Sequence, residues 1–295
     1  MMTSSCPGWI CYAEKTHGDF ILPYISQVKS PQQIMGSLVK KYFNKTIGVN
    51  SNRIYHMALM PCFDKKLEAS REDFFDEILK SRDVDLVITS LEIEGILQDR
   101  EVDFNSLLHS PLDKELSLTD EEGKLRGHAG SSSGGYLDHV FKNSARHLYG
   151  HNPSYGENIK YKMLRNKDFQ EIVLSCDGED KLRFAFAFGF RNIQNIVQKI
   201  KRKKCNYHFI EIMACPSGCV NGGGQIRAET KDEAKNLLDK AEKLYHSLPL
   251  EDPRTDKKVD ELYKELSTDG SANNPFLHTT YHEVKKNNTA LNIKW

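Results

Sequence analysis

The sequence lacks an excess of charge of either sign, a long apolar run and an export signal. Its 295 residues include 41 basic and 41 acidic side chains, so the formal net charge is zero. Bulk charge therefore does not favour nucleic acid or an anionic membrane surface as a partner. No apolar run reaches the length of a membrane span. The start, MMTSSCPGWICYAEK, has no basic segment followed by an apolar one, so we expect no secretory signal.

Cysteine is the residue type that the chain does have in an informative number. Seven cysteines are too many to ignore, yet the number is odd and the chain is long, so a disulfide scaffold is a poor interpretation. We expect reduced thiols in the cytosol or nucleus, where clustered cysteines are more often metal ligands or catalytic groups. The seven are Cys6, Cys11, Cys62, Cys176, Cys205, Cys215 and Cys219.

Strand and helix signals alternate along the chain, which predicts an α/β fold. In the first hundred residues we predict helices at 30–43 and 90–99 and strands at 53–62 and 84–89. Beyond residue 135 we predict strands at 159–164, 168–176, 181–190 and 207–215, and helices at 136–150, 192–204 and 231–248.

The expected architecture has two lobes, with mainly parallel sheets flanked by helices. Residues 1–100 form the first α/β lobe, and residues 136–295 form the second, with C-terminal helices and a tail. Between them, residues 101–135 are polar and rich in Gly and Ser, which predicts a flexible linker or a long loop.

The stretch EIMACPSGCVNGGGQIR, residues 211–227, combines two cysteines with a glycine triplet. A phosphate loop fits poorly, because NGGGQ lacks the Gly-Lys-Ser/Thr ending and the glycine spacing of nucleotide-binding motifs. A redox pair usually has two residues between its cysteines, whereas Cys215 and Cys219 have three. Zinc, an iron–sulfur cluster and buried thiols that pack as small apolar groups remain as alternatives.

Cys62 and Cys215 each follow a predicted strand, where an open parallel sheet binds its ligands. Cys6 is preceded by only five residues, and we predict no strand there. Structural zinc sites usually take two close pairs of ligands, but only Cys215 and Cys219 form such a pair. Scattered ligands favour a cluster, and glycines beside them would let the backbone approach a bulky inorganic core.

Three motifs resemble the signature motifs of the iron-only hydrogenase family, and they occur in the family's order. They are TSSCPGW, MPCFDKKLE and EIMACPSGCVNGGGQ. The stretches CPGWICYAEKTHG, SPQQIMGSLVKKYF, LRNKDFQE and GFRNIQN resemble the eukaryotic hydrogenase-like branch. That branch comprises a component of cytosolic iron–sulfur protein assembly and its paralogue, the nuclear prelamin A recognition factor. The wording of CPSGC and CPGWICYAEK is more similar to the assembly component.

The resemblance implies one 4Fe–4S cluster, held by Cys6, Cys62, Cys215 and Cys219. Cys6 and Cys62 would come from the first lobe and the other two from the second, with the cluster in the cleft between lobes. The other three cysteines match no motif of the family. We interpret Cys11 as a thiol near the site, Cys176 as a turn residue and Cys205 as a packing residue.

The resemblance also bears on catalysis. Hydrogenases of the family carry a two-iron unit bridged through a cluster cysteine, and the matching residue here is Cys219. They also have a proton-relay cysteine, and the matching residue here is Ser5. A hydroxyl is far less acidic than a thiol, so we expect no hydrogenase activity. Lys65 and Met60 match residues near the two-iron unit. The expected function is a non-enzymatic, cluster-binding component of cytosolic iron–sulfur protein assembly; the alternatives are a prelamin A-binding protein and an iron hydrogenase.

Both ends of the chain carry expectations. The related assembly proteins have a further N-terminal region with a second cluster site, so this chain resembles an N-terminally truncated form. Trp295, at the C-terminus, resembles a tail that docks on the cytosolic targeting complex; folding back on its lobe is the alternative.

Other partners and the location of the protein also follow from the resemblance. A lamin-type partner would fit the paralogue. We expect a cytoplasmic protein, with a nuclear location as the alternative. The run KIKRKK, 199–204, is interpreted as a solvated helix end.

Overall fold

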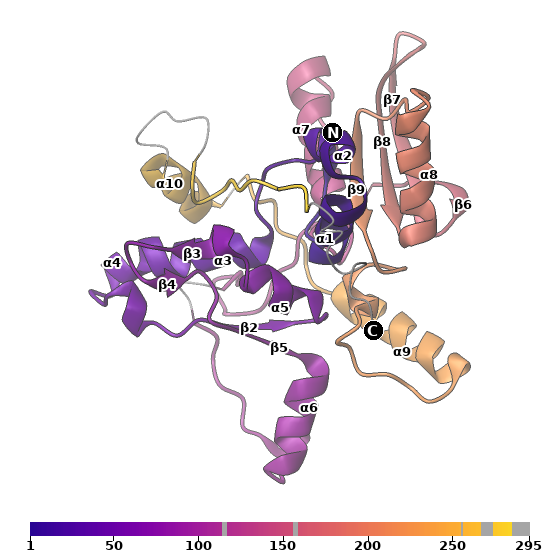
Figure 1. Cartoon of the computed structure of the whole chain (residues 1–295). Helices are drawn as coiled ribbons and strands as arrows, with labels where there is room; N and C mark the ends of the chain where they lie inside the picture. Colours follow the sequence, from indigo (N-terminus) through magenta and orange to yellow (C-terminus); the bar gives the residue numbers. More distant parts are fainter. Residues whose placement is uncertain (114–116, 156–158, 255, 267–273, 285–295) are drawn as a thin grey trace, which may run out of the picture.

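The computed structural model describes residues 1–113, 117–155, 159–254, 256–266 and 274–284. Two sheets organise these residues (Figure 1). A large sheet has the strand order β1-β9-β8-β7-β6, and a small sheet pairs β2 with β5. The large sheet consists of β1 (Met2–Thr3), β6 (Lys162–Asn166), β7 (Phe169–Cys176), β8 (Glu179–Phe188) and β9 (Phe209–Met213). The small sheet consists of β2 (Met57–Met60) and β5 (Leu86–Thr89).

The predicted α/β fold class is confirmed, but the large sheet is only half parallel. Strand β9 runs parallel to both β1 and β8, whereas β7 is antiparallel to β8 and β6. The turn at Asp177 and Gly178 closes the β7–β8 hairpin, with φ of 54° and 78°. These positive angles suit a tight hairpin turn, and the dipeptide Asp177-Gly178 is of a type that favours such a turn.

Helices cover both faces of the large sheet. Helices α1 (Pro7–Thr16) and α8 (Phe190–Lys201) pack on one face, and α7 (Tyr136–Tyr149) packs on the other. Small side chains on β8, Ala185 and Ala187, let the first two helices approach closely. The core under α1 and α8 includes Trp9, Ile10, Ile193, Ile196, Ile210 and Ile212. The core under α7 includes Leu137, Phe141, Leu182, Phe184 and Phe209.

The start of the chain departs from the prediction. The sequence predicted no strand before Cys6, yet Met2 and Thr3 pair with Ile210 and Glu211 of β9. Residues of α1 also pack against the large sheet, so the first segment belongs with β9 and not with the small sheet. A strand of two residues has no periodicity to read, and its pairing depends on a partner that lies far along the chain.

The small sheet carries its own helices, which are α3 (Pro31–Leu38), α5 (Asp64–Ala69) and α6 (Ser90–Asp99). Helix α3 continues through a π-helical turn, Val39–Phe43, into α4 (Asn44–Thr46). Its buried side is polar, with Gln33, Ser37 and Lys40 inside. Lys40 pairs with Asp85 at 2.7 Å, so the buried cation has a partner.

Further helices and strands lie outside these two groups. Helices α9 (Lys231–Tyr245) and α10 (Lys257–Leu266) follow β9, and α2 (Gly18–Ile21) follows α1. Strands β3 (Phe75–Asp76) and β4 (Ser81–Arg82) form a small ribbon. The predicted helices 90–99, 136–150 and 231–248 are confirmed as α6, α7 and α9. Figure 1 shows α6 projecting away from the rest of the molecule.

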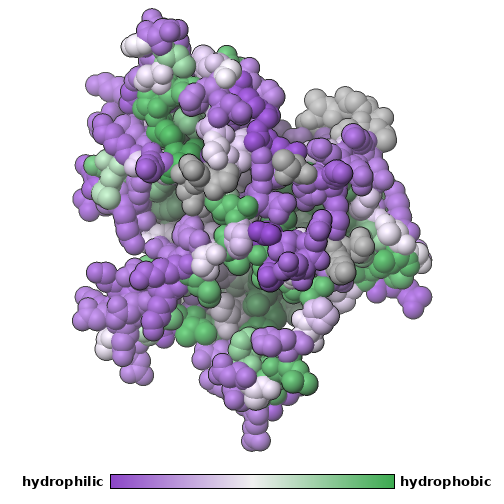
Figure 2. Space-filling model, turned by 180° about the vertical axis from the view of Figure 1, so that it is seen from behind, coloured by the Kyte–Doolittle hydropathy of each residue, from purple (hydrophilic) through white to green (hydrophobic). Residues whose placement is uncertain are grey.

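In the stretch predicted as a linker or loop, 101–135, the described residues have little regular structure, but the end of the stretch is anchored. Gly127 N donates to Pro249 O at 2.9 Å, and Ser133 is only 3% exposed. Figure 2 shows hydrophilic side chains over most of the molecule's back, with apolar ones visible in the hollows between its parts. Within the described ranges, no helix is both long and apolar enough to span a membrane.

Candidate metal centre

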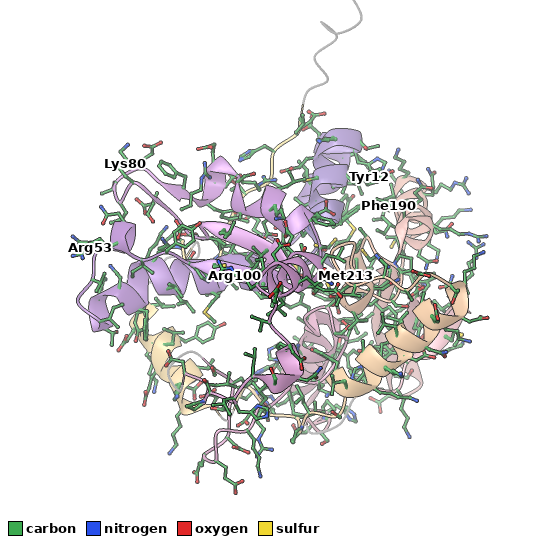
Figure 3. All side chains as sticks on the ribbon, turned by 90° about the horizontal axis from the view of Figure 1, so that it is seen from below. Tyr12, Arg53, Lys80, Arg100, Phe190 and Met213 are labelled. Atoms are coloured by element: carbon green, nitrogen blue, oxygen red, sulfur yellow. The ribbon has the colours of Figure 1, made fainter. Side chains whose placement is uncertain are left out.

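Two of the candidate ligands lie at the carboxyl ends of neighbouring parallel strands. Cys6 follows β1 and is the N-cap of α1, while Cys215 comes two residues after β9. The β1–β9 pairing brings both ends to the same edge of the large sheet. Ser4 Oγ donates to Ile212 O at 2.5 Å and fixes this edge. In Figure 3, Met213 at the end of β9 lies in the middle of the molecule, between Arg53 and Phe190.

The other two candidate ligands complete one cavity. Cys62 comes two residues after β2, and Cys219 lies in the loop after β9. All four predicted cysteines line a single cavity of about 210 Å³. The expected division of two ligands per lobe is wrong, because Cys6 belongs with the large sheet. The rest of the lining includes Ser5, Pro7, Gln32, Met60, Lys65, Ser133, Met213, Gly218 and Gly222.

The glycine triplet joins the two sheets. Gly224 N donates to Pro61 O at 2.9 Å, and a Cβ at Gly222 would lie only 2.3 Å from the same oxygen. A Cβ at Gly223 would meet no atom within 4 Å. Two of the three glycines are therefore needed for contact between protein segments, whereas the sequence led us to expect room for an inorganic core.

Ser133 is a site residue that sequence reasoning missed. Its hydroxyl accepts a hydrogen bond from Cys219 N at 2.8 Å, and its carbonyl accepts one from Ser5 Oγ at 2.8 Å. Gly134 and Gly135, with φ of 117° and 63°, turn the chain sharply after it. The run SSSGG could have indicated this role, because serines beside turn-forming glycines can form hydrogen bonds with backbone groups. We interpreted the run only as part of a polar linker.

A buried polar network lies behind the cavity wall. Lys65 Nζ pairs with Glu68 at 3.1 Å. The same carboxylate accepts hydrogen bonds from Ser30 Oγ at 2.5 Å and Gln32 Nε2 at 3.3 Å. The other end of that amide, Gln32 Oε1, is buried without a partner. Lys65 and Met60 both line the cavity, as expected for residues close to a bound group.

The surroundings of the four thiols disfavour the negatively charged thiolate forms. Burial raises the pKa of Cys62 and of Cys215 to about 11, and the neighbouring cysteines act in the same direction. Burial also raises the pKa of Cys6 and of Cys219. Lys65 opposes these shifts at Cys6, Cys62 and Cys219. The thiols are therefore neutral near pH 7, and four thiolates would need a strongly cationic group between them.

The size of the cavity bears on which group the four thiols could hold. In the part of the chain that the structure describes, no three His, Cys, Asp or Glu side chains are arranged to hold a metal ion. Zinc needs its sulfur ligands about 2.3 Å away, which requires a tightly closed set. Four sulfurs around an open cavity suit a group of several atoms, as an iron–sulfur cluster is.

The remaining cysteines stand outside this cavity. Cys176 ends β7 beside the hairpin turn, and Cys205 packs against the edge of the core under α1 and α8. Cys11, on α1, lines a separate small cavity with Cys6. Trp295 lies outside the described residues.

Comparison with known proteins identifies the family. Residues 1–223 match the family described as "Iron only hydrogenase large subunit, C-terminal domain". The chain belongs to this family. The apo [FeFe]-hydrogenase HydA1 from Chlamydomonas reinhardtii superimposes with a TM-score of 0.79 at 27% identity, covering 96% of this chain and 76% of that one. A second solved [FeFe]-hydrogenase gives a TM-score of 0.80 at 27% identity.

Curated relatives are more similar in sequence. A probable cytosolic Fe-S cluster assembly factor of Aedes aegypti is 52% identical over all of this chain and 62% of its own length. The cytosolic iron-sulfur assembly component 3 of Rattus norvegicus is 49% identical over all of this chain and 61% of its own length. This chain therefore spans 61–62% of the length of these two relatives.

The contact between the glycine triplet and Pro61 generates a matched pair of variants. We expect Gly222→Ala to destabilise the protein by about 1–3 kcal/mol, because the new Cβ meets a backbone oxygen that cannot swing away. Gly223→Ala has open space around its Cβ and should change stability by less than about 0.5 kcal/mol. Urea unfolding of both variants measures the difference; equal midpoints would contradict the contact.

Proposed function

We propose that this chain binds one 4Fe–4S cluster through Cys6, Cys62, Cys215 and Cys219, and that it serves cytosolic iron–sulfur protein assembly. The observation that carries the proposal is the single cavity that these four thiols line. Thiolates are the usual protein ligands of such clusters. A bound cluster supplies iron, sulfide and an electron-accepting centre.

Residues of the chain would hold the group in three ways. The thiols lose their protons on binding, and Lys65 lowers the pKa of three of them. Ser133 fixes the backbone of Cys219 through its amide, so that ligand is oriented before anything binds. The Pro61 contact holds the loop that carries Cys62 against the loop that carries Cys219.

The names of the relatives favour a role in iron–sulfur cluster assembly. The Aedes aegypti protein is named a probable cytosolic assembly factor, and the Rattus norvegicus protein is named an assembly component. On this basis we propose a cytoplasmic protein whose partners belong to the cytosolic assembly machinery.

The arrangement around Ser5 supports a role without hydrogen turnover. Its hydroxyl lines the cavity and donates to Ser133 O, with Met213 Sδ also 3.7 Å away. A hydroxyl fixed in this way is a weak acid and a poor proton donor near neutral pH. We therefore propose that the protein carries a cluster and is not an enzyme.

Metal content tests the cluster directly. Protein purified without oxygen should contain roughly four iron and four acid-labile sulfide per chain. Each of the variants Cys6→Ser, Cys62→Ser, Cys215→Ser and Cys219→Ser should lose most of that content, because a hydroxyl binds iron far more weakly than a thiolate. Cys176→Ser, at the hairpin turn, is the matched control and should keep it. Zinc without sulfide would refute the proposal.

Hydrogen evolution tests the absence of turnover. With a strong chemical reductant, the cluster-loaded protein should release no hydrogen above the level of Cys219→Ser, because Ser5 cannot relay protons as a thiol does. Gas chromatography of the headspace measures the rate. A reproducible rate that depends on Cys219 would mean that the protein is a hydrogenase.

The partner proposal concerns the end of the chain. Trp295 combines an aromatic ring with the terminal carboxylate, which together make a compact recognition feature. Deletion of Trp295 should abolish co-purification of the cytosolic targeting complex while bound iron stays unchanged. Unchanged co-purification would assign the docking to another surface.

A further inference from the structure

Two neighbouring segments of this electrically neutral chain carry charge of one sign only. Neither residues 160–167 nor residues 191–204 contain an acidic side chain. The cations of the first are Lys160, Lys162, Arg165 and Lys167; those of the second are Arg191, Lys199, Lys201, Arg202, Lys203 and Lys204. The first segment contains β6 and the second contains most of α8.

The fold brings these segments together in a groove. Figure 1 shows β6 beside α8, and the side-chain amides of Asn166 and Asn192 bond to each other across them. A groove of about 450 Å³ runs between the two elements. Its lining contains no carboxylate and consists of Arg165, Phe169, Asn195, Gln198, Lys199, Arg202 and Lys204. We call this feature the cationic groove.

The cations of the groove are not paired with carboxylates in the part of the chain that the structure describes. Among the described residues, neither Arg165, Arg202 nor Lys204 forms an ion pair. Lys199 lies over two aromatic rings, 5.5 Å from the centroid of Phe169 and 5.0 Å from that of Tyr207. Asn195 Nδ2 is buried and has no hydrogen-bond acceptor. A buried donor without an acceptor is costly.

One wall of the groove is also an open sheet edge. β6 is the last strand of the large sheet and, within the described part of the chain, pairs only with β7. Its side chains are exposed, including the apolar Met163 at 60% and Leu164 at 37%. An irregularity in register falls between Met163 and Asn166. Such an edge offers backbone donors and acceptors that only another polypeptide matches residue by residue.

We propose that the cationic groove and the β6 edge form a docking site for an extended, acidic segment of a partner protein. The partner's backbone would add to β6, and its carboxylates would face Arg165, Arg202 and Lys204. Charge alone would equally serve a nucleic acid, but the sheet edge and the exposed Met163 and Leu164 favour a polypeptide. The site shares no lining residue with the cysteine cavity, so it stands independently of the cluster.

A simpler interpretation explains only part of these observations. Lysines on an edge strand discourage aggregation, and cations at a helix C-terminus interact favourably with its dipole. Neither effect requires that cations of β6 and α8 converge on one groove. Neither effect explains a buried amide donor at Asn195 in that groove.

The test uses the full 295-residue chain and a fluorescent peptide of about ten alternating Glu and Val residues, the length of a long strand. Fluorescence anisotropy at about 0.15 M ionic strength measures binding. The triple variant Arg165→Glu, Arg202→Glu, Lys204→Glu should weaken binding by roughly tenfold or more. All three side chains are exposed, so the fold should be retained, and a thermal melt checks it.

A second triple variant supplies the matched control. Lys235→Glu, Lys240→Glu, Lys243→Glu on α9 makes the same change in net charge on another exposed surface and should leave binding unchanged. Hydrogen exchange should also slow at the backbone amides of residues 162–166 when the peptide binds, because strand addition protects them. An equal effect of the two triple variants, unprotected β6 amides, or tighter binding of a DNA duplex than of the peptide would each overturn the proposal.

Discussion

The close approach of two backbones at Pro61 is the constraint on which the candidate metal centre depends. Cys62 follows the small sheet, whereas the other three thiols follow the large one, so a cavity with four sulfurs requires the sheets to be locked together. The lock includes the hydrogen bond from Gly224 N to Pro61 O and the absence of a side chain at Gly222. Glycine is needed here because a residue without a Cβ lets another backbone segment approach closely.

The electrostatics of the cavity favour neutral thiols, so the thiolate forms require a cationic group between the four sulfurs. Burial raises the pKa of all four thiols, and neighbouring cysteines raise those of Cys62, Cys215 and Cys219 further, so the thiols are neutral near pH 7. Metal binding must replace those protons, and Lys65 is the nearby cation that makes the replacement easier. Because Lys65 is itself paired with Glu68, its charge is held in position and partly balanced.

Local signals in the sequence predicted the local structure well. Gly150 ends α7 in a left-handed conformation, and Asp177 and Gly178 turn the hairpin, as their types indicate. The motifs also located all four cysteines of the cavity. Contacts between distant residues escaped prediction: the pairing of Met2 with β9, and the contacts of Ser133 with Ser5 and Cys219. In both cases the partner lies more than eighty residues away, and no periodic pattern encodes such a choice.

The turn between β6 and β7 connects the cationic groove with the metal centre. Arg165 lines the groove; three residues later, Asp168 Oδ1 accepts a hydrogen bond from Ser217 N at 2.7 Å. Ser217 lies between Cys215 and Cys219 in a left-handed conformation, with φ of 60°, so its loop depends on such anchors. One turn therefore anchors the loop that carries two of the proposed ligands and also adjoins a wall of the cationic groove, although the two sites share no lining residue.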